Sequence, residues 1–154
     1  GLWAGAKYYN APFEVIGIPI EPDYHSLQQT ADFLNQISET YDMGFTCTPE
    51  EIHLELGPAE APYGGAGYNL PDRETWETIA HLARSEGVFL DPCYTGKSFR
   101  GFVDLVRRGK IAADSGAIFL DTGGAPGLWG REQLGFAQGL FWNDDRNITV
   151  FKAQ

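Results

Sequence analysis

The chain has 154 residues, of which 43% are hydrophobic and 14% aromatic, as expected for a globular domain with its own core rather than for a disordered chain. Its formal net charge of −10 excludes a general nucleic-acid-binding protein, because a phosphate backbone demands a basic protein face. With two cysteines, Cys47 and Cys93, the sequence predicts neither a disulfide framework nor a metal site.

Targeting signals are absent from the visible sequence. No apolar run approaches the length of a membrane span and no signal peptide is present, so we expect a cytoplasmic protein without a membrane partner. The chain begins at Gly1 and its only methionine is Met43. We therefore expect that it was trimmed, processed or cut from a longer polypeptide.

The first half of the chain alternates strand and helix patterns. Residues 1–9 resemble the end of a helix, and the apolar run 13–20 predicts a strand buried on both faces. Residues 22–23, Pro-Asp, signal the start of a helix, and apolar side chains recur at steps of three and four through residues 24–41. Residues 51–57 alternate polar and apolar side chains, which predicts a strand or an edge strand.

The second half opens with a Gly/Pro-rich loop over residues 58–71, and loops of that length are often functional. Residues 72–87 predict a helix that is capped by Asp72 and ended by Gly87, with an apolar stripe. A short buried segment, 88–92, and a helix over 98–108 come next.

The last part of the chain is a strand, a glycine turn and a helix start over residues 117–127. The tail after residue 131 has no clear pattern, although residues 147–151 are a candidate last strand. The alternation of strands and helices along the whole chain predicts an α/β layered fold.

Three loops concentrate the residues that can carry chemistry: 64–71, 91–98 and 121–127. The second and third follow apolar segments, and in an open α/β sheet ligands bind beyond the C-terminal ends of the strands. Glycines there let the backbone approach a flat ring or an anion. The pattern alone leaves structural interpretations open, because the tyrosines fit core positions with a wet hydroxyl, Thr122 fits a helix cap, and Lys97 fits a solvated lysine.

A resemblance resolves part of this ambiguity. The segments GAGYNLP, TIAHLARSEGVFLDPCYTGKSFRGFVDLVRRGK and IFLDTGGAPGLW, from about Gly64 to Trp129, resemble the C-terminal half of the D-cysteine desulfhydrase and 1-aminocyclopropane-1-carboxylate deaminase family. These are pyridoxal-phosphate enzymes of the tryptophan-synthase-β fold type, fold type II. The resemblance implies a three-layer α/β/α fold with a mostly parallel sheet, of which this chain is the C-terminal part.

The resemblance also implies roles for individual residues. Tyr94 matches the family's active-site tyrosine, which transfers a proton or orients the substrate, and Tyr68 matches a second tyrosine that lines the same pocket. Thr95 and Thr122 match the positions that separate the branches of the family. The cofactor-binding residues implied for this chain are Thr122, Thr95, Gly123 and Gly124.

Threonine at positions 95 and 122 resembles the desulfhydrase branch, whereas the deaminase branch has glutamate and leucine there. A glutamate beside the pyridine nitrogen favours the protonated ring, whereas a threonine hydroxyl is neutral and withdraws less charge. The implied reaction is β-elimination on D-cysteine, which gives sulfide, pyruvate and ammonia. Asp121 stands where histidine is expected, Cys93 where valine is common and Asn69 where glycine is common, which puts the substrate in doubt.

The resemblance places the cofactor's Schiff-base lysine and the phosphate-binding loop in an N-terminal half that precedes Gly1, so Lys97 is expected to have a structural role. Residues 1–130 are then an incomplete catalytic domain and residues 131–154 a tail of unassigned role. The implied partners are a small amino-acid substrate, the N-terminal half and a second copy in a homodimer. Alone, the chain is expected to bind the cofactor weakly and to lack activity. Deamination of 1-aminocyclopropane-1-carboxylate and a non-catalytic interaction module are the alternatives.

Overall fold

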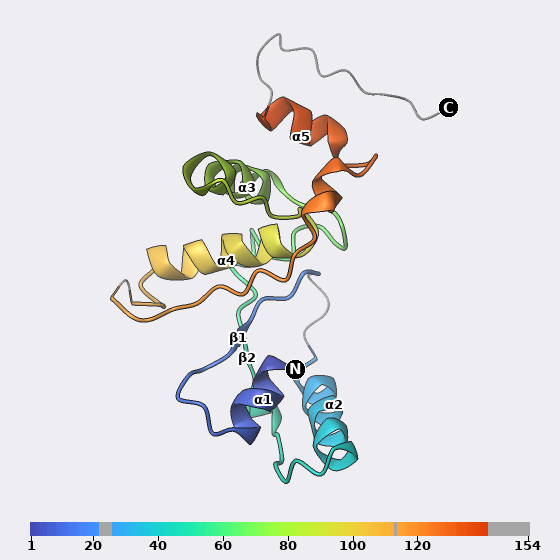
Figure 1. Ribbon diagram of the computed structural model, residues 1–154, viewed down its shortest axis with the longest axis vertical. Coiled ribbons are helices and arrows are strands. Elements are labelled where there is room, and N and C mark those ends of the chain that lie inside the picture. Colours follow the sequence, from blue (N-terminus) through green and yellow to red (C-terminus); the bar gives the residue numbers. More distant parts are fainter. Residues whose placement is uncertain (22–25, 113, 142–154) are drawn as a thin grey trace. The chain divides into compact units, whose positions relative to one another are not determined.

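A computed structural model describes residues 1–21, 26–112 and 114–141 (Figure 1). The chain divides into two compact units, residues 1–68 and 69–154, and each is described by itself. The elements in chain order are α1 (Leu2–Tyr8), β1 (Ile16–Gly17), α2 (Leu27–Thr40), the 3-10 helix η1 (Pro49–Glu51), β2 (His53–Leu54), α3 (Arg73–Glu86), α4 (Thr95–Arg107), the 3-10 helix η2 (Ala125–Trp129) and α5 (Leu134–Phe141).

The first unit is built around helix α2. Its small core joins Ala4 of α1, Ala31 and Leu34 of α2, and Cys47. Side chains on α2 also bind the backbone that follows it: the Asn35 amide donates to the Cys47 carbonyl at 2.9 Å and accepts from the Cys47 N–H at 2.7 Å. These paired bonds fix an irregular segment against the helix, because they satisfy backbone groups that have no strand partner.

The sheet of the described residues is small. Strands β1 and β2 pair in parallel, with Ile16 opposite His53 and Gly17 opposite Leu54. A side chain at Gly17 would place its Cβ 2.6 Å from the end of the Leu54 side chain, so a larger residue there would require Leu54 to move. The parallel pairing together with the helices agrees with the α/β class that the sequence pattern predicts.

The strand predictions were too long. Pairing over residues 13–20 is limited to two residues, and the expected burial on both faces is wrong, because residues 15–20 are half-buried and Phe13 is 60% exposed. Residues 117–121, predicted as a strand, contain none, and the segment 88–92, expected to be buried, is buried only at residues 90–92. A β-prone segment becomes a strand only where a neighbouring backbone completes its hydrogen bonds, and the described residues supply such a neighbour only at β1 and β2.

The helix predictions were closer. Helix α3 begins after Asp72, whose carboxylate accepts the Thr75 N–H at 2.8 Å, and it ends at Gly87, which has a φ of +70°. Both caps are the expected ones. Helix α4 starts at Thr95, three residues before the predicted start. The predicted start signal at residues 22–23 and the candidate strand at 147–151 lie outside the described residues.

The second unit has a core between α3, α4 and the C-terminal helices. Trp76, Ile79, Leu90, Leu128 and Ala137 are its buried members. Helix α5 was not predicted, yet it closes this core, because Phe136 stacks on Trp76 with ring centroids 5.8 Å apart. Arg84 of α3 also donates a hydrogen bond to the Leu140 carbonyl of α5. The first part of the unassigned tail is therefore part of the folded unit.

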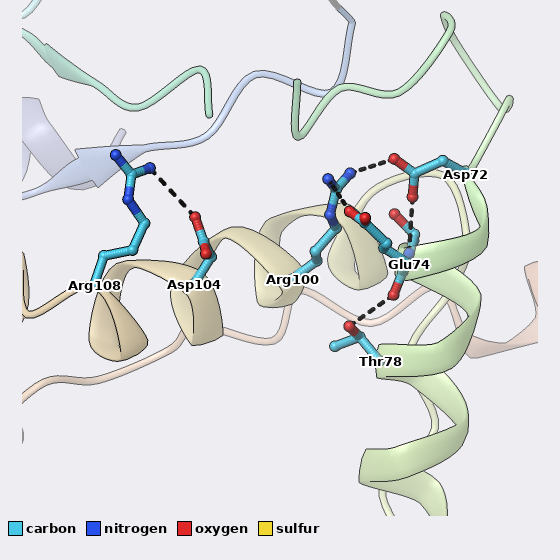
Figure 2. Close-up of polar contacts among 7 residues, drawn as sticks. Asp72, Glu74, Thr78, Arg100, Asp104 and Arg108 are labelled. Carbon is cyan, nitrogen blue, oxygen red and sulfur yellow. Dashed lines mark hydrogen bonds and ion pairs between the residues drawn. The ribbon is translucent and has the colours of Figure 1, made fainter. Parts of the chain in front are cut away.

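An ion-pair cluster joins the start of α3 to the middle of α4 (Figure 2). Arg100 of α4 is 7% exposed, and its guanidinium contacts the carboxylates of Asp72 and Glu74. Asp72 is also the N-cap of α3, so a single carboxylate caps one helix and binds the other. The segment from residue 91 to α4 is thereby held on the same core as α3.

Candidate functional site

The loop before α4 is organised by Asp91, which is 3% exposed. One carboxylate oxygen, Oδ2, accepts the N–H groups of Cys93 at 2.7 Å and Tyr94 at 2.8 Å. The other, Oδ1, accepts the N–H of Thr95 at 2.8 Å and its hydroxyl at 2.7 Å. Four donors thus converge on one buried carboxylate, which satisfies backbone groups that a helix N-terminus leaves unpaired.

Tyr94 occupies the N-cap position of α4 and its side chain makes no cap bond. The side chain is 44% exposed, so the phenol faces outward while its backbone is held from below by Asp91. The core position that was the structural alternative for Tyr94 is therefore wrong. An exposed phenol on a fixed backbone is suited to contact a small molecule.

Thr95 lies inside the loop rather than on its surface. It is 3% exposed, and its hydroxyl donates to the Asp91 carboxylate while accepting the Asp91 N–H at 3.0 Å. The next residue, Gly96, has no room for a side chain, because a Cβ there would lie 2.6 Å from the Asp91 carbonyl oxygen and from Ile79. The threonine and the glycine of the motif YTGK both serve the close packing of this turn.

The glycine turn of residues 121–124 packs directly on the same aspartate. Gly124 has a φ of +95°, and a Cβ there would lie 3.0 Å from Asp91 Oδ1, so only glycine fits this contact. Gly123 has a φ of +90° with no atom within 4 Å of its Cβ position. Its N–H donates to the Asp121 carboxylate at 2.9 Å, and Thr122 beside it is exposed.

The second and third of the candidate loops are therefore adjacent, and Asp91 is the residue between them. The structure brings Thr95 and Gly124 to Asp91, with Tyr94 and Gly123 next to them in sequence. Tyr68 is the last residue of the first unit and is 53% exposed, so it too is not a core tyrosine. The rest of its loop, from Asn69, belongs to the second unit, where Gln133 donates to the Asn69 carbonyl at 3.0 Å.

Lys97 is fully buried. The interpretation of Lys97 as a solvated side chain is therefore wrong, and a structural role agrees with its burial. Cys93 is also buried and forms no disulfide. It therefore packs as a small apolar residue. Among the described residues there is no cluster of His, Cys, Asp or Glu side chains that could hold a metal ion.

Sequence reasoning missed Asp91 as the centre of the site, although it stood in the quoted motif. The signal was present: an aspartate three to four residues before a helix start is a common capping arrangement. It also missed a cleft of about 440 Å³ in the first unit beside β2, whose lining includes Glu14, Glu50 and His53. That cleft contains none of the predicted site residues.

The comparisons with known proteins point to enzymes that act on small amino acids. No family model matches the chain. A 1-aminocyclopropane-1-carboxylate deaminase of Rhizobium leguminosarum bv. viciae is 34% identical over 134 residues, which cover 84% of this chain and 37% of that protein. The D-cysteine desulfhydrase of Yersinia enterocolitica (serotype O:8 / biotype 1B) is 32% identical over 129 residues, with the same two shares.

A putative 1-aminocyclopropane-1-carboxylate deaminase of Pyrococcus abyssi is 30% identical over 137 residues, which cover 87% of this chain and 38% of that protein. The chain belongs to the family of 1-aminocyclopropane-1-carboxylate deaminase and D-cysteine desulfhydrase, as its motifs indicated. It spans between a third and two fifths of the length of these relatives. No described helix combines the length and the apolar character that a membrane crossing requires.

Proposed function

We propose that the chain is the C-terminal segment of a pyridoxal-phosphate-dependent lyase that acts on a small amino acid, with D-cysteine desulfhydrase as the first candidate. The observation that carries the proposal is the arrangement around Asp91, which sets the outward-facing Tyr94 and the Gly123–Gly124 turn on one buried carboxylate. The relatives, which include a D-cysteine desulfhydrase, support the same class.

The described residues fit such a cofactor at the glycine turn. No atom lies within 4 Å of a Cβ at Gly123, so a flat ring can approach the backbone there. The exposed Thr122 offers a neutral hydroxyl beside that open space. We infer that Thr122, Gly123 and Gly124 hold one edge of pyridoxal phosphate, and that Thr95 contributes by keeping the neighbouring loop in place.

The proposed roles of the tyrosines follow from their chemistry. When bound, pyridoxal phosphate supplies an electron sink for the bond that breaks at the substrate's α-carbon. Tyr94 moves or holds the proton and orients the amino acid, and Tyr68 lines the same pocket. A free phenol ionises at a pKa of about 10, so proton abstraction by Tyr94 requires surroundings that stabilise the phenolate.

Lys97 is not the covalent anchor in this proposal. Its side chain is fully buried, so an incoming aldehyde has no open path to its amine in this fold. We place the anchoring lysine in the part of a relative's length that this chain does not span, together with the phosphate loop. Residues 1–130 then belong to a three-layer α/β/α catalytic domain, the described start of the tail, residues 131–141, packs on the core of the second unit, and a homodimer is the expected assembly.

Deamination of 1-aminocyclopropane-1-carboxylate is the second candidate. It is favoured by several similar relatives that carry that name, at 34–37% identity. The threonines at 95 and 122 favour the desulfhydrase instead, because neither supplies the carboxylate that would stabilise a protonated pyridine ring. A third outcome, an interaction module without catalysis, applies if the glycine turn takes no cofactor.

The first experiment titrates the purified chain with pyridoxal phosphate and follows its absorbance and its amide NMR spectrum. We expect weak binding, with shifts concentrated at Tyr94, Thr122 and Gly123, and no imine band that depends on Lys97. An imine band that Lys97→Ala abolishes would contradict the role given to this lysine. Shifts spread evenly along the chain, or none at all, would reject the cofactor site.

The second experiment identifies the substrate. The chain is mixed with, or joined to, the part of the Yersinia enterocolitica relative that it does not match, and D-cysteine is assayed for sulfide release. Tyr94→Phe is expected to lower the rate by about 10²–10⁴-fold, the usual contribution of a proton-transferring group. Turnover of 1-aminocyclopropane-1-carboxylate without sulfide release would select the deaminase.

A further inference from the structure

The feature behind this inference is that Tyr94 occupies a helix N-cap without being able to cap. Ser, Thr, Asp or Asn at that position would accept the orphan N–H groups of the first turn, and a tyrosine side chain does not. Its φ of −115° and ψ of −75° place it at the entry of α4, and its carbonyl accepts the Ser98 N–H at 3.0 Å. The phenol thus takes no part in capping α4, and the residue is 44% exposed.

Asp91 supplies the missing cap from three residues upstream. Its two carboxylate oxygens each accept two donors, all of them from residues 93 to 95, at 2.7–2.8 Å. Its own carbonyl accepts the Gly96 N–H at 2.8 Å, and its N–H donates to the Thr95 hydroxyl. The backbone N–H groups of Cys93, Tyr94 and Thr95, which set the direction of the Tyr94 side chain, are therefore all bonded to Asp91.

The glycine turn of residues 121–124 packs against the same carboxylate. Around Gly124, the Oδ1, Cγ and Cβ atoms of Asp91 lie 3.0, 3.1 and 3.2 Å from the position that a Cβ would take. Gly127 also approaches the Asp91 Cβ, at 3.5 Å from its own Cβ position. Movement of Asp91 would therefore shift both loops together.

We propose that Asp91 is a positioning residue that sets the phenol of Tyr94 against the Thr122–Gly124 turn, with the Thr95 hydroxyl as its partner. The role in the reaction rests on the proposed function, whereas the ordering of the two loops does not. Asp91 itself touches no substrate in this proposal. It acts because one buried, fully bonded carboxylate fixes two surfaces that must face the same small molecule.

Two pairs of variants test the proposal on the whole chain. Both carboxylate oxygens of Asp91 accept at least one backbone N–H. In Asp91→Asn the new side-chain amide therefore turns its own N–H₂ group toward an N–H donor in either orientation. Asp32→Asn is its control, since Asp32 is exposed on α2 and binds the Gln28 side chain. Thr95→Val removes the hydroxyl at similar volume, and Thr95→Ser keeps it.

The first readout is amide hydrogen exchange without any cofactor. Asp91→Asn is expected to speed exchange at Cys93, Tyr94 and Thr95 by about tenfold or more, because charge-assisted bonds are lost. Thr95→Val should have a smaller effect of the same kind, which Thr95→Ser reverses. The α3 amides of Ile79 and Ala80 should keep their rates. Equal acceleration on α3 would reduce Asp91 to a general stabiliser and overturn the proposal, as would unchanged rates at residues 93–95.

The second readout is the response to pyridoxal phosphate. Asp91→Asn is expected to weaken binding by about tenfold and to reduce the shifts at Tyr94 and Gly123 together, as expected when preorganisation is lost. Asp32→Asn, which removes an exposed charge on α2, controls for net charge and should leave both unchanged. Faster exchange with unaltered binding would overturn the positioning role. A wild-type chain without any response would reject the proposed function, and the exchange data would still decide whether Asp91 orders the two loops.

Discussion

His53 on β2 lies between two carboxylates. Its Nδ1 is 2.5 Å from Glu14 Oε1 and its Nε2 is 3.2 Å from Glu55 Oε1. The hydrogen bond with Glu14 is the main cause that raises the pKa of His53 above its ordinary value, with Glu55 adding to it and partial burial opposing it. The His53 ring therefore links the segment before β1 to strand β2.

This geometry predicts a pH-dependent contribution to stability. Because the folded pKa is the higher one, the stabilisation is fully present below the unfolded pKa of about 6.5 and is lost as pH rises through the folded pKa. The effect should stay below about 1 kcal/mol, since the ring is more than a third exposed. Urea unfolding of wild type and His53→Gln, from pH 5.5 to 8.5, should show a difference that shrinks as pH rises.

Proton NMR checks the cause. The His53 ring should titrate above pH 6.5, and Glu14→Gln should lower the midpoint more than Glu55→Gln does. A stability difference that grows toward pH 8.5 would have the wrong sign for this account.

At the scale of single residues, the sequence identifies residue types that suit a site, but it does not show which residues lie next to one another in the fold. Tyr94 and the glycines at 123 and 124 were singled out from their motifs; Tyr94 is 44% exposed and the Gly123 position is open, whereas Gly124 is packed against Asp91. Asp91 was not identified, because its role depends on where four donors and a distant glycine turn come to lie. The burial of Lys97 was not predicted either, because the motif does not show which residues cover a lysine, although the structural role implied by the resemblance agrees with that burial.

At the scale of elements, the cluster around Arg100 decides how α3 and α4 stay together (Figure 2). Arg100 is almost fully buried, whereas the Asp72 side chain is 33% exposed and that of Glu74 is 61% exposed. The ion pairs of Arg100 are therefore intermediate in burial between a fully buried and a surface ion pair. Removal of the arginine alone leaves two carboxylates close together at the start of a helix.

We expect Arg100→Met to destabilise the second unit by about 1–3 kcal/mol, between the values for exposed and buried pairs. Arg73→Met is the control, since the pair with Glu77 is on the surface, and its change should stay within about 0.5 kcal/mol. Chemical denaturation measures both. A double-mutant cycle with Glu74→Gln separates the ion pair from lost packing. An Arg100→Met effect as small as that of Arg73→Met would reject the cluster as a link between the helices.

Helices were predictable here and strands were not, for a physical reason. Helix α3 carries its own cap, stripe and stop signal within sixteen residues, so local sequence determines its bounds. Strands need a second chain segment, which local sequence does not name. Helix α5 was not predicted because the packing of its apolar face depends on a residue distant in sequence, Trp76, on which Phe136 stacks.

At the scale of the whole molecule, some apolar segments form no strand with any other part of the chain that the structure describes. In the second unit Ile118 is 91% exposed and Leu120 is 52% exposed, and Val88 and Phe89 before the Asp91 loop are 40% and 44% exposed. Soluble domains rarely leave β-prone apolar segments open, because such segments bind one another.

The last prediction concerns what this surface does in solution. The chain should bind the dye ANS and self-associate at micromolar concentration, and the double variant Ile118→Thr, Leu120→Thr should lower the dye signal by about twofold or more, since apolar exposure drives both. Phe33→Thr, a single exposed ring on α2, is the control and should change the signal little. Dye fluorescence and sedimentation measure the two effects. If the double variant binds as much dye as the wild type, then residues 118 and 120 are covered in solution. Other residues then already pack against this segment, and the prediction is wrong.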